Sequence, residues 1–181
     1  MKRLFLGLEL PKVTQRALAD LDPQIKGLRW LPPEQLHLTM SFLGDVGSGQ
    51  QEDLIAKLES VYVPPFFLPI QGLGAFGGAH PTVVWAGVGK GHPHLYALHK
   101  HLQDAVLGAG LEADLRPFHP HITLGRAKNI SRSTLKPFLQ KHAEVEFDFW
   151  KVTGFALFSS ILSPEGARYT VEYCRDFEDR S

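Results

Sequence analysis

The sequence predicts an α+β fold in which two antiparallel β-sheets, flanked by helices, form two lobes around a central cleft. Helix-like and hairpin-like segments mix without the strict strand–helix–strand rhythm of a parallel sheet. A chain of 181 residues with 44% hydrophobic residues can fill one core. A short pattern also occurs twice: His37-Leu38-Thr39-Met40, and 84 residues later His121-Ile122-Thr123-Leu124. We therefore expect residues 1–181 to form a single bilobal domain with pseudo-two-fold symmetry.

The first half of the chain predicts a strand, a helix and the strand that carries the first motif. Arg3–Glu9 alternates like a strand, and Pro11 can open a helix that runs to Leu21 before Asp22-Pro23. The other elements expected here are strands at Leu28–Leu31, at Leu36–Leu43 (stopped by Gly44) and at Val83–Val88, a helix at Gln50–Val61, an edge or irregular segment at Pro64–Pro69, and a flexible cleft rim from Gly72 to Gly78.

The second half predicts two helices and a run of strands. Pro93 opens a helix through Leu107, and Ser131 can cap a helix to His142 that Pro137 would interrupt. The strands expected here are His121–Gly125, Val145–Val152, Phe155–Leu162 and Arg168–Arg175, the last two joined by a hairpin turn at residues 163–166.

Charge and cysteine content limit the environment and the ligands. The net charge is zero, which gives no overall field to hold nucleic acid non-specifically. The window from Leu115 to Ala143 is locally basic and contains the second motif, so it would attract an anionic ligand. Cys174, the single cysteine, permits no intrachain disulfide and is expected to be buried. With no signal-peptide pattern and no apolar run of membrane-spanning length, we expect a cytoplasmic protein without membrane contact.

Each motif places an imidazole and a hydroxyl on one face of a strand. Residues i and i+2 of a strand point to the same side, so His37 lies beside Thr39 and His121 beside Thr123. By chance the chain would contain about 0.35 matches to His-x-Thr, which makes a single match weak and a pair informative. Opening a phosphodiester needs a base, an acid on the opposite side of phosphorus, and donors for the non-bridging oxygens. Two such strands facing each other supply all three.

Arg126 is a candidate to add charge-assisted bonds to the phosphate. In a regular strand Arg126 has the opposite parity to His121, so we expect Gly125 to bend the chain and bring the guanidinium round. We therefore predict that His37 and His121 are catalytic and that Thr39, Thr123 and Arg126 bind phosphate. Which histidine is the acid and which the base is left open by the residues themselves.

Three blocks resemble the two-histidine (2H) phosphoesterases, specifically the RNA 2′,3′-cyclic phosphodiesterases, also called 2′-5′ RNA ligases. The blocks are residues 3–11 (RLFLGLELP), 29–44 (RWLPPEQLHLTMSFLG) and 117–126 (PFHPHITLGR). The resemblance implies a bilobal fold and metal-free, cofactor-free hydrolysis of terminal 2′,3′-cyclic phosphates to 2′-phosphomonoesters. It also implies that His37 is the acid, that His121 is the base, and that the reverse reaction would be 2′-5′ ligation. RNA or oligonucleotide ends and small cyclic nucleotides are the implied partners; we expect a monomer.

Two alternatives compete with this hypothesis. A non-catalytic module could bind RNA ends without turnover, although binding alone has no need of two imidazoles. A metal-dependent phosphodiesterase could use His37, His119 and His121. Four further histidines, His92, His94, His99 and His101, lack an accompanying carboxylate or thiol cluster, so we expect no metal site there. Core packing is the expected role of Phe5, Trp30, Phe42 and Phe118, with base stacking as the alternative.

Overall fold

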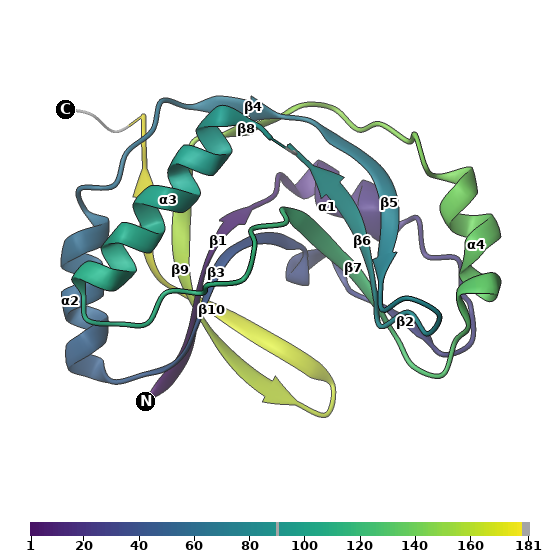
Figure 1. Cartoon of the computed structure of the whole chain (residues 1–181), viewed down its shortest axis with the longest axis horizontal. Coiled ribbons are helices and arrows are strands. Elements are labelled where there is room, and N and C mark those ends of the chain that lie inside the picture. The colour runs from purple at the N-terminus through teal and green to yellow at the C-terminus, as the bar shows by residue number, and fades with distance from the viewer. Residues whose placement is uncertain (90, 179–181) are drawn as a thin grey trace.

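The computed structural model describes residues 1–89 and 91–178, and within them four α-helices and ten strands (Figure 1). The helices are α1 (Lys12–Ala19), α2 (Ser48–Leu58), α3 (Pro93–Gly108) and α4 (Arg132–Lys141), with a 3₁₀ turn at Pro33–Gln35. The strands are β1 (Lys2–Glu9), β2 (Leu28–Trp30), β3 (His37–Val46), β4 (Phe66–Leu68), β5 (Ile70–Phe76), β6 (Val83–Val88), β7 (His121–Ala127), β8 (Trp150–Val152), β9 (Gly154–Ser163) and β10 (Gly166–Asp176).

The strands form two lobes that meet at one residue pair. Strands β10, β9, β1 and β3 make the first lobe, while β2, β7, β6 and β5 make the second; every pairing between these strands is antiparallel. Strands β3 and β7 join the lobes through the single pair Leu38–Ile122. Strands β4 and β8 form a separate two-stranded sheet, at the top of Figure 1. This arrangement confirms the predicted bilobal α+β fold.

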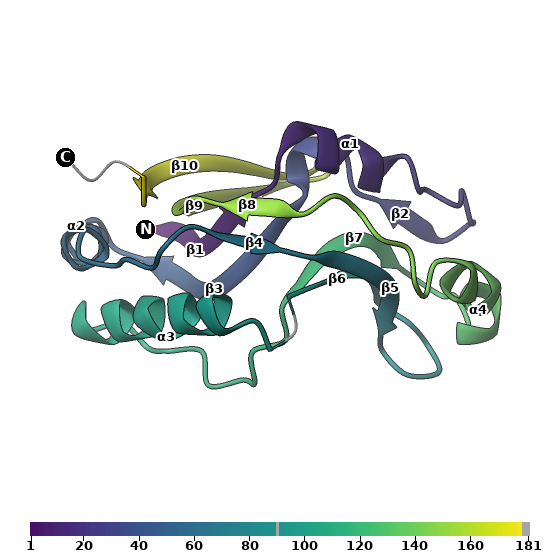
Figure 2. The ribbon, with the colours of Figure 1, turned by 90° about the horizontal axis from the view of Figure 1, so that it is seen from above.

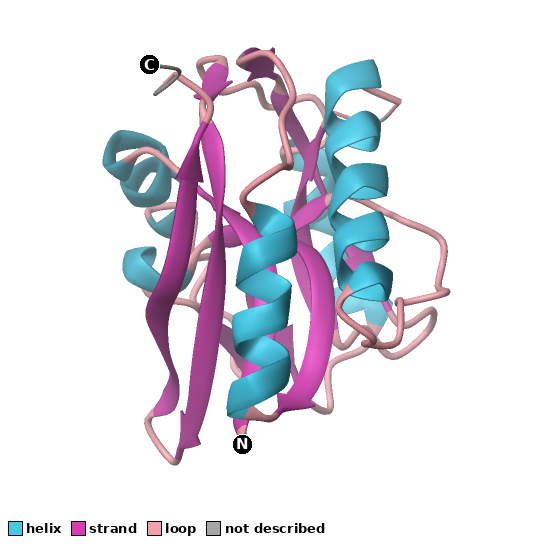
Figure 3. Ribbon diagram, turned by 90° about the vertical axis from the view of Figure 1, so that its left-hand side faces the viewer, coloured by secondary structure: helices cyan, strands magenta, loops and turns pink. Residues whose placement is uncertain are grey.

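The helices cover the lobes unequally, and one core extends through both. Helices α2 and α3 lie side by side next to the strands of the first lobe (Figure 3), while α4 lies at the far end of the second (Figure 2). Apolar side chains from both lobes join one buried cluster, in which Leu6 and Leu38 belong to the first lobe and Ile122 to the second. Burying both motif strands against one core fixes their outward faces relative to each other.

The first part of the glycine-rich stretch, through Gly72 and Gly74, is strand, and Gly77 and Gly78 follow in a bend and a turn. Gly72 and Gly74 lie within β5. A Cβ on Gly74 would lie 2.4 Å from Cζ2 of Trp85, so the missing side chain lets the indole lie flat on the neighbouring strand. Glycine permits a close approach at Gly74, so the expected flexible rim was wrong for Gly72 and Gly74, while it stays a prediction for Gly77 and Gly78.

Other differences from the predicted elements are local. Strand β3 continues through Gly44 to Val46, and only Trp150–Val152 of the predicted strand from Val145 forms a ladder. Pro137 lies inside an unbroken α4, whose cap is Ser131 as predicted. Cys174 is exposed rather than buried. Among residues 1–89 and 91–178, no helix is both long and apolar enough to cross a bilayer.

Candidate active site

The two motifs face each other about the pair that joins the lobes. Because Leu38 pairs with Ile122 in antiparallel register, His37 lies across from Thr123 and Thr39 across from His121. Leu38 and Ile122 are fully buried, whereas all four polar residues are half-buried on the opposite face. The two histidines are thus diagonal neighbours, which in a regular ladder places them about 7–8 Å apart. Both rings can reach one ligand.

Backbone carbonyls fix the orientation of both imidazoles in the same way. Nδ1 of His37 lies 2.8 Å from the carbonyl oxygen of Gln35, and Nδ1 of His121 lies 2.7 Å from that of His119. Only a protonated Nδ1 can donate to a carbonyl, so Nε2 carries the lone pair in each neutral ring. In His37 this Nε2 accepts from the Thr39 hydroxyl at 2.9 Å. Each histidine is therefore arranged to exchange a proton through Nε2.

Burial lowers the pKa of both histidines. Desolvation is the main cause of the lowered pKa of His37, whose ring packs 4.9 Å from Phe5 and 5.1 Å from Tyr169; His121 and Arg126 lower it further by charge repulsion. Desolvation is also the main cause for His121, whose ring meets the edge of Phe76 at 5.0 Å. The carbonyl bonds to Gln35 and His119 act in the opposite direction. In the unliganded protein both rings accordingly favour the neutral form at pH 7.

A β-bulge brings Arg126 onto the face of the histidines, as predicted from Gly125. Gly125 pairs with Val84 but Thr123 pairs with Trp85, which leaves Leu124 as an extra residue in β7. Both Leu124 and Gly125 are buried, and Arg126 emerges exposed on the cleft side. A Cβ on Gly125 would lie 2.9 Å from Cε3 of Trp30, so a larger residue at this position would press on the indole.

The five predicted site residues line one cleft of about 740 Å³ together with three further arginines. His37, Thr39, His121, Thr123 and Arg126 all border it, as do Arg3, Arg29 and Arg116, with no acidic residue among the described lining. Arg29 of β2 pairs directly with Arg126 of β7. Like charges opposite each other destabilise a sheet, so this pair favours an anion between or beside the guanidinium groups.

A family model described as LigT-like phosphoesterase matches this chain over residues 8–85 and 88–169. The chain belongs to this family. The resemblance inferred from the motif blocks is thereby confirmed.

Relatives and solved structures agree with this assignment. A protein of Aquifex aeolicus named RNA 2′,3′-cyclic phosphodiesterase is 33% identical over 92% of this chain and 90% of its own length. One of the same name from Archaeoglobus fulgidus is 32% identical over 92% and 96%. A crystal structure of a Thermus thermophilus protein superposes with a TM-score of 0.81 at 29% identity over 97% of both chains. The E. coli LigT crystal structure complexed with 3′-AMP gives 0.77 at 25% identity, again over 97% of both chains.

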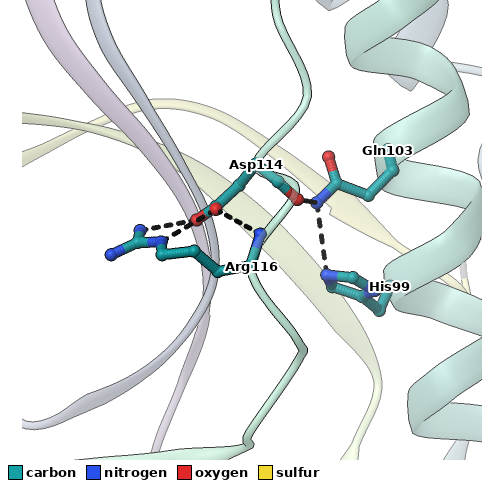
Figure 4. A network of polar contacts seen from close by, with 4 residues as sticks. All are labelled: His99, Gln103, Asp114 and Arg116. Carbon is teal, nitrogen blue, oxygen red and sulfur yellow. Dashed lines mark hydrogen bonds and ion pairs between the residues drawn. The ribbon is translucent and has the colours of Figure 1, made fainter.

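In this LigT-like phosphoesterase, a network of polar contacts positions Arg116, one of the arginines that line the cleft (Figure 4). The basic run in the sequence did not indicate this network. Arg116 donates from Nε and Nη2 to the two carboxylate oxygens of Asp114, at 2.9 and 2.6 Å. Gln103 of α3 donates to the Asp114 carbonyl at 3.5 Å and lies 3.3 Å from Nε2 of His99. Asp114 lies just outside the window that seemed purely basic, and it partly neutralises Arg116 while positioning it 6.0 Å from the ring of Phe42.

The remaining predicted residues have mixed outcomes. Phe42 is exposed and lines the cleft, and Phe5 packs on His37, whereas Trp30 packs on the core. His99 stacks on Phe118 with ring centroids 4.0 Å apart. Across the described part of the chain, no three His, Cys, Asp or Glu side chains are grouped as a metal site requires.

Sequence reasoning missed four cleft residues: Arg3, Arg29, Gln35 and Tyr169. Gln35 has two roles, because its carbonyl orients His37 while its side-chain amide donates to the Ala167 carbonyl, 2.9 Å away, in the β9–β10 hairpin. The only available signal was the position of Arg29 and Gln35 beside the first motif.

Proposed function

We propose that this chain is a metal-independent RNA 2′,3′-cyclic phosphodiesterase that produces 2′-phosphomonoesters, in which the single bilobal domain closes one site from two sides. The observation that carries the proposal is the paired geometry of the histidines. Both carry Nδ1–carbonyl bonds of the same kind, both direct Nε2 to one cleft, and the cleft is lined by arginines. The relatives named RNA 2′,3′-cyclic phosphodiesterase support the choice of substrate.

In the proposed reaction, a water oxygen attacks phosphorus while its proton passes to Nε2 of His121. The bond between phosphorus and the 3′-oxygen breaks, and that oxygen takes a proton from Nε2 of His37, which leaves the phosphate on the 2′-oxygen. Thr39 and Thr123 donate to the non-bridging oxygens, and Arg126 and Arg29 neutralise their charge. His37 must be protonated before the step, and the phosphate anion favours this by raising the pKa that burial has lowered. Exchange with solvent then restores both rings.

Two imidazoles suffice for both proton transfers, so the proposed reaction requires no metal ion or cofactor. The same step with a 5′-hydroxyl in place of water opens the cyclic phosphate into a 2′-5′ bond, and its reverse cleaves that bond to give the cyclic phosphate and a free 5′-hydroxyl. The motifs address the phosphate rather than a base, so RNA ends and small cyclic nucleotides both fit as substrates. A monomeric, cytoplasmic protein remains our prediction; the single cysteine supports a reducing compartment.

The decisive experiment incubates the protein with an oligonucleotide ending in a 2′,3′-cyclic phosphate, in the presence of EDTA. We expect conversion to a 2′-phosphate. Phosphorus NMR of the product distinguishes a 2′-phosphate from a 3′-phosphate. Binding without turnover would instead favour an RNA-end binding module. Activity lost on chelation and restored by zinc would favour the metal-dependent alternative.

A further inference from the structure

A second cavity of about 500 Å³ lies next to the catalytic cleft and has a different chemistry. We call it the aromatic pocket; its described rings belong to Trp85, His92, Tyr96, Phe118 and His119, and Gln71 and Gly87 also line it. Among its described lining residues there is no Asp, Glu, Lys or Arg. The catalytic cleft, by contrast, is bordered by four arginines. The described walls of this pocket are aromatic and carry no carboxylate, ammonium or guanidinium group, which suits a flat, uncharged ring rather than a phosphate.

The aromatic pocket and the catalytic cleft share a wall. In the loop from residue 116 to 121, Arg116 and His121 line the cleft, whereas Phe118, His119 and Pro120 line the aromatic pocket. The ring centroids of His119 and His121 are 6.0 Å apart. Gly87 pairs with His121 across β6 and β7, and Trp85 pairs with Thr123, so both face the same side as the motif. The pocket therefore lies directly beyond His121.

The position beyond His121 determines which part of a substrate could occupy the aromatic pocket. In an in-line displacement, the entering and departing oxygens lie on opposite sides of phosphorus. In the proposed reaction His37 serves the ribose 3′-oxygen, so the terminal nucleoside of a cyclic phosphate lies on the side of the first lobe. His121 serves the other oxygen. During hydrolysis that oxygen belongs to water, which leaves the aromatic pocket without a role.

We propose that the aromatic pocket binds the base of a nucleoside whose 5′-oxygen occupies the His121 side. This inference rests on the proposed function and extends it to a second nucleoside. In the joining direction, the 5′-hydroxyl attacks phosphorus and gives its proton to His121 as the bond to the 3′-oxygen breaks and that oxygen takes a proton from His37. In the cleaving direction, the 3′-hydroxyl gives its proton to His37 and attacks phosphorus, and the departing 5′-oxygen takes a proton from His121.

Tyr96 is the residue best suited to test the pocket. It lies on the first turn of α3, is 36% exposed, and meets the edge of Phe118 with ring centroids 5.3 Å apart. It does not line the catalytic cleft. Its removal should therefore leave both histidines undisturbed, and Tyr96→Phe preserves the stacking surface while removing the hydroxyl. Phe149→Ala is a matched control, since Phe149 is an exposed aromatic residue that borders neither cavity.

The experiment compares three substrates: adenosine 2′,3′-cyclic phosphate, the 2′-5′-linked dinucleotide of two adenosines, and the same dinucleotide with an abasic 5′-linked ribose. Stacking of one base should make the wild-type kcat/KM for the full dinucleotide about 5- to 150-fold higher than for the abasic one. Tyr96→Ala should remove most of this preference and change cyclic-phosphate hydrolysis less than about twofold. Tyr96→Phe and Phe149→Ala should keep the preference.

Three results would overturn the inference while leaving the proposed function intact. They are an equal loss on all three substrates in Tyr96→Ala, equal cleavage of the full and abasic dinucleotides by the wild type, and hydrolysis of the cyclic phosphate without any cleavage of the 2′-5′ bond. A wild-type protein that fails to open the cyclic phosphate would overturn both proposals. Thermal unfolding of each variant separates a lost contact from a lost fold.

Discussion

The two motif strands have the same architecture but present different chemistry. From His37 to Phe42 and from His121 to Arg126, burial follows the same six-residue order: half-buried, buried, half-buried, buried, buried, exposed. Each strand contains an extra residue at its fourth position, Met40 in β3 and Leu124 in β7. The sixth residue, which the bulge brings round to the cleft, is an aromatic ring in one lobe and a guanidinium in the other.

The partner strands maintain this difference. Phe42 pairs with Phe5 in the first lobe, whereas Arg126 pairs with Arg29 in the second. At the sixth position the first lobe therefore presents an apolar ring to the cleft, and the second presents a positive charge. A shared backbone design thus places the two imidazoles, and under the proposed function the sixth position would specialise each lobe, one for a sugar or base and the other for phosphate oxygens.

Removing either histidine should have the largest effect on activity, and the two variants should differ in how their rates depend on pH. We expect His37→Ala and His121→Ala each to lower kcat by about 10²- to 10⁴-fold while remaining folded. The acid must be protonated, so the loss of rate at high pH should disappear in His37→Ala. The base must be deprotonated, so the loss of rate at low pH should disappear in His121→Ala. The reverse pattern, measured as kcat/KM against pH, would exchange the two roles.

Replacing the sixth residue should have unequal effects in the two lobes. Arg126→Ala removes charge-assisted bonds to phosphate and should lower kcat/KM about 10- to 150-fold. Phe42→Ala removes only apolar contact and should raise KM less than about tenfold. Steady-state kinetics on a cyclic mononucleotide compares them directly, and equal losses would contradict the proposed specialisation.

Substitutions at the fifth position of the two motif strands should have different effects on the free energy of unfolding. Gly125→Ala forces a Cβ against Trp30 and should lower the free energy of unfolding by about 1–3 kcal/mol. Ser41, the equivalent residue, has a buried hydroxyl without a hydrogen-bond partner among the described residues, so Ser41→Ala should be neutral or slightly stabilising. Urea unfolding of both variants provides the test, in which a neutral Gly125→Ala would be unexpected.

Replacing Arg29 should change stability and ligand binding in opposite directions. With Arg126 no longer facing a like charge, Arg29→Ala should raise the free energy of unfolding by about 0.2–1 kcal/mol at low salt. The same variant should bind inorganic phosphate more weakly. Calorimetry and denaturation in parallel would measure both, and tighter phosphate binding would rule out the proposed role of the arginine pair.

The pH optimum of the free enzyme should lie on the acidic side of 6.5. A bell-shaped kcat/KM profile has its maximum midway between the pKa values of the acid and the base. Burial lowers the pKa of both His37 and His121 below 6.5, so the midpoint is lower too. Profiles recorded at constant ionic strength check this, and a maximum well above pH 7 would contradict the assigned pair.

Local pattern was sufficient to predict the motif faces, because strand alternation places His37 with Thr39 and His121 with Thr123 whatever the rest of the chain does. The bend at Gly125 followed from parity alone. Arg29 could not be predicted in the same way, since its importance comes from pairing with a residue far along the chain. The strand through Gly72 and Gly74 was missed for a related reason: only the indole of Trp85, from another strand, explains why glycine belongs there.

Because of the bulges, the direction of the sixth side chain depends on the number of residues in each motif strand rather than on their identity. Deleting one residue at Met40 or Leu124 would restore simple alternation and turn the sixth side chain inward. Phe42 is apolar and suits such a buried position, whereas Arg126 would bury an unpaired guanidinium among apolar side chains. Substitutions at the sixth position, by contrast, leave the count unchanged. An engineer wishing to give this scaffold a new ligand should therefore exchange side chains there and never shorten or extend the strand.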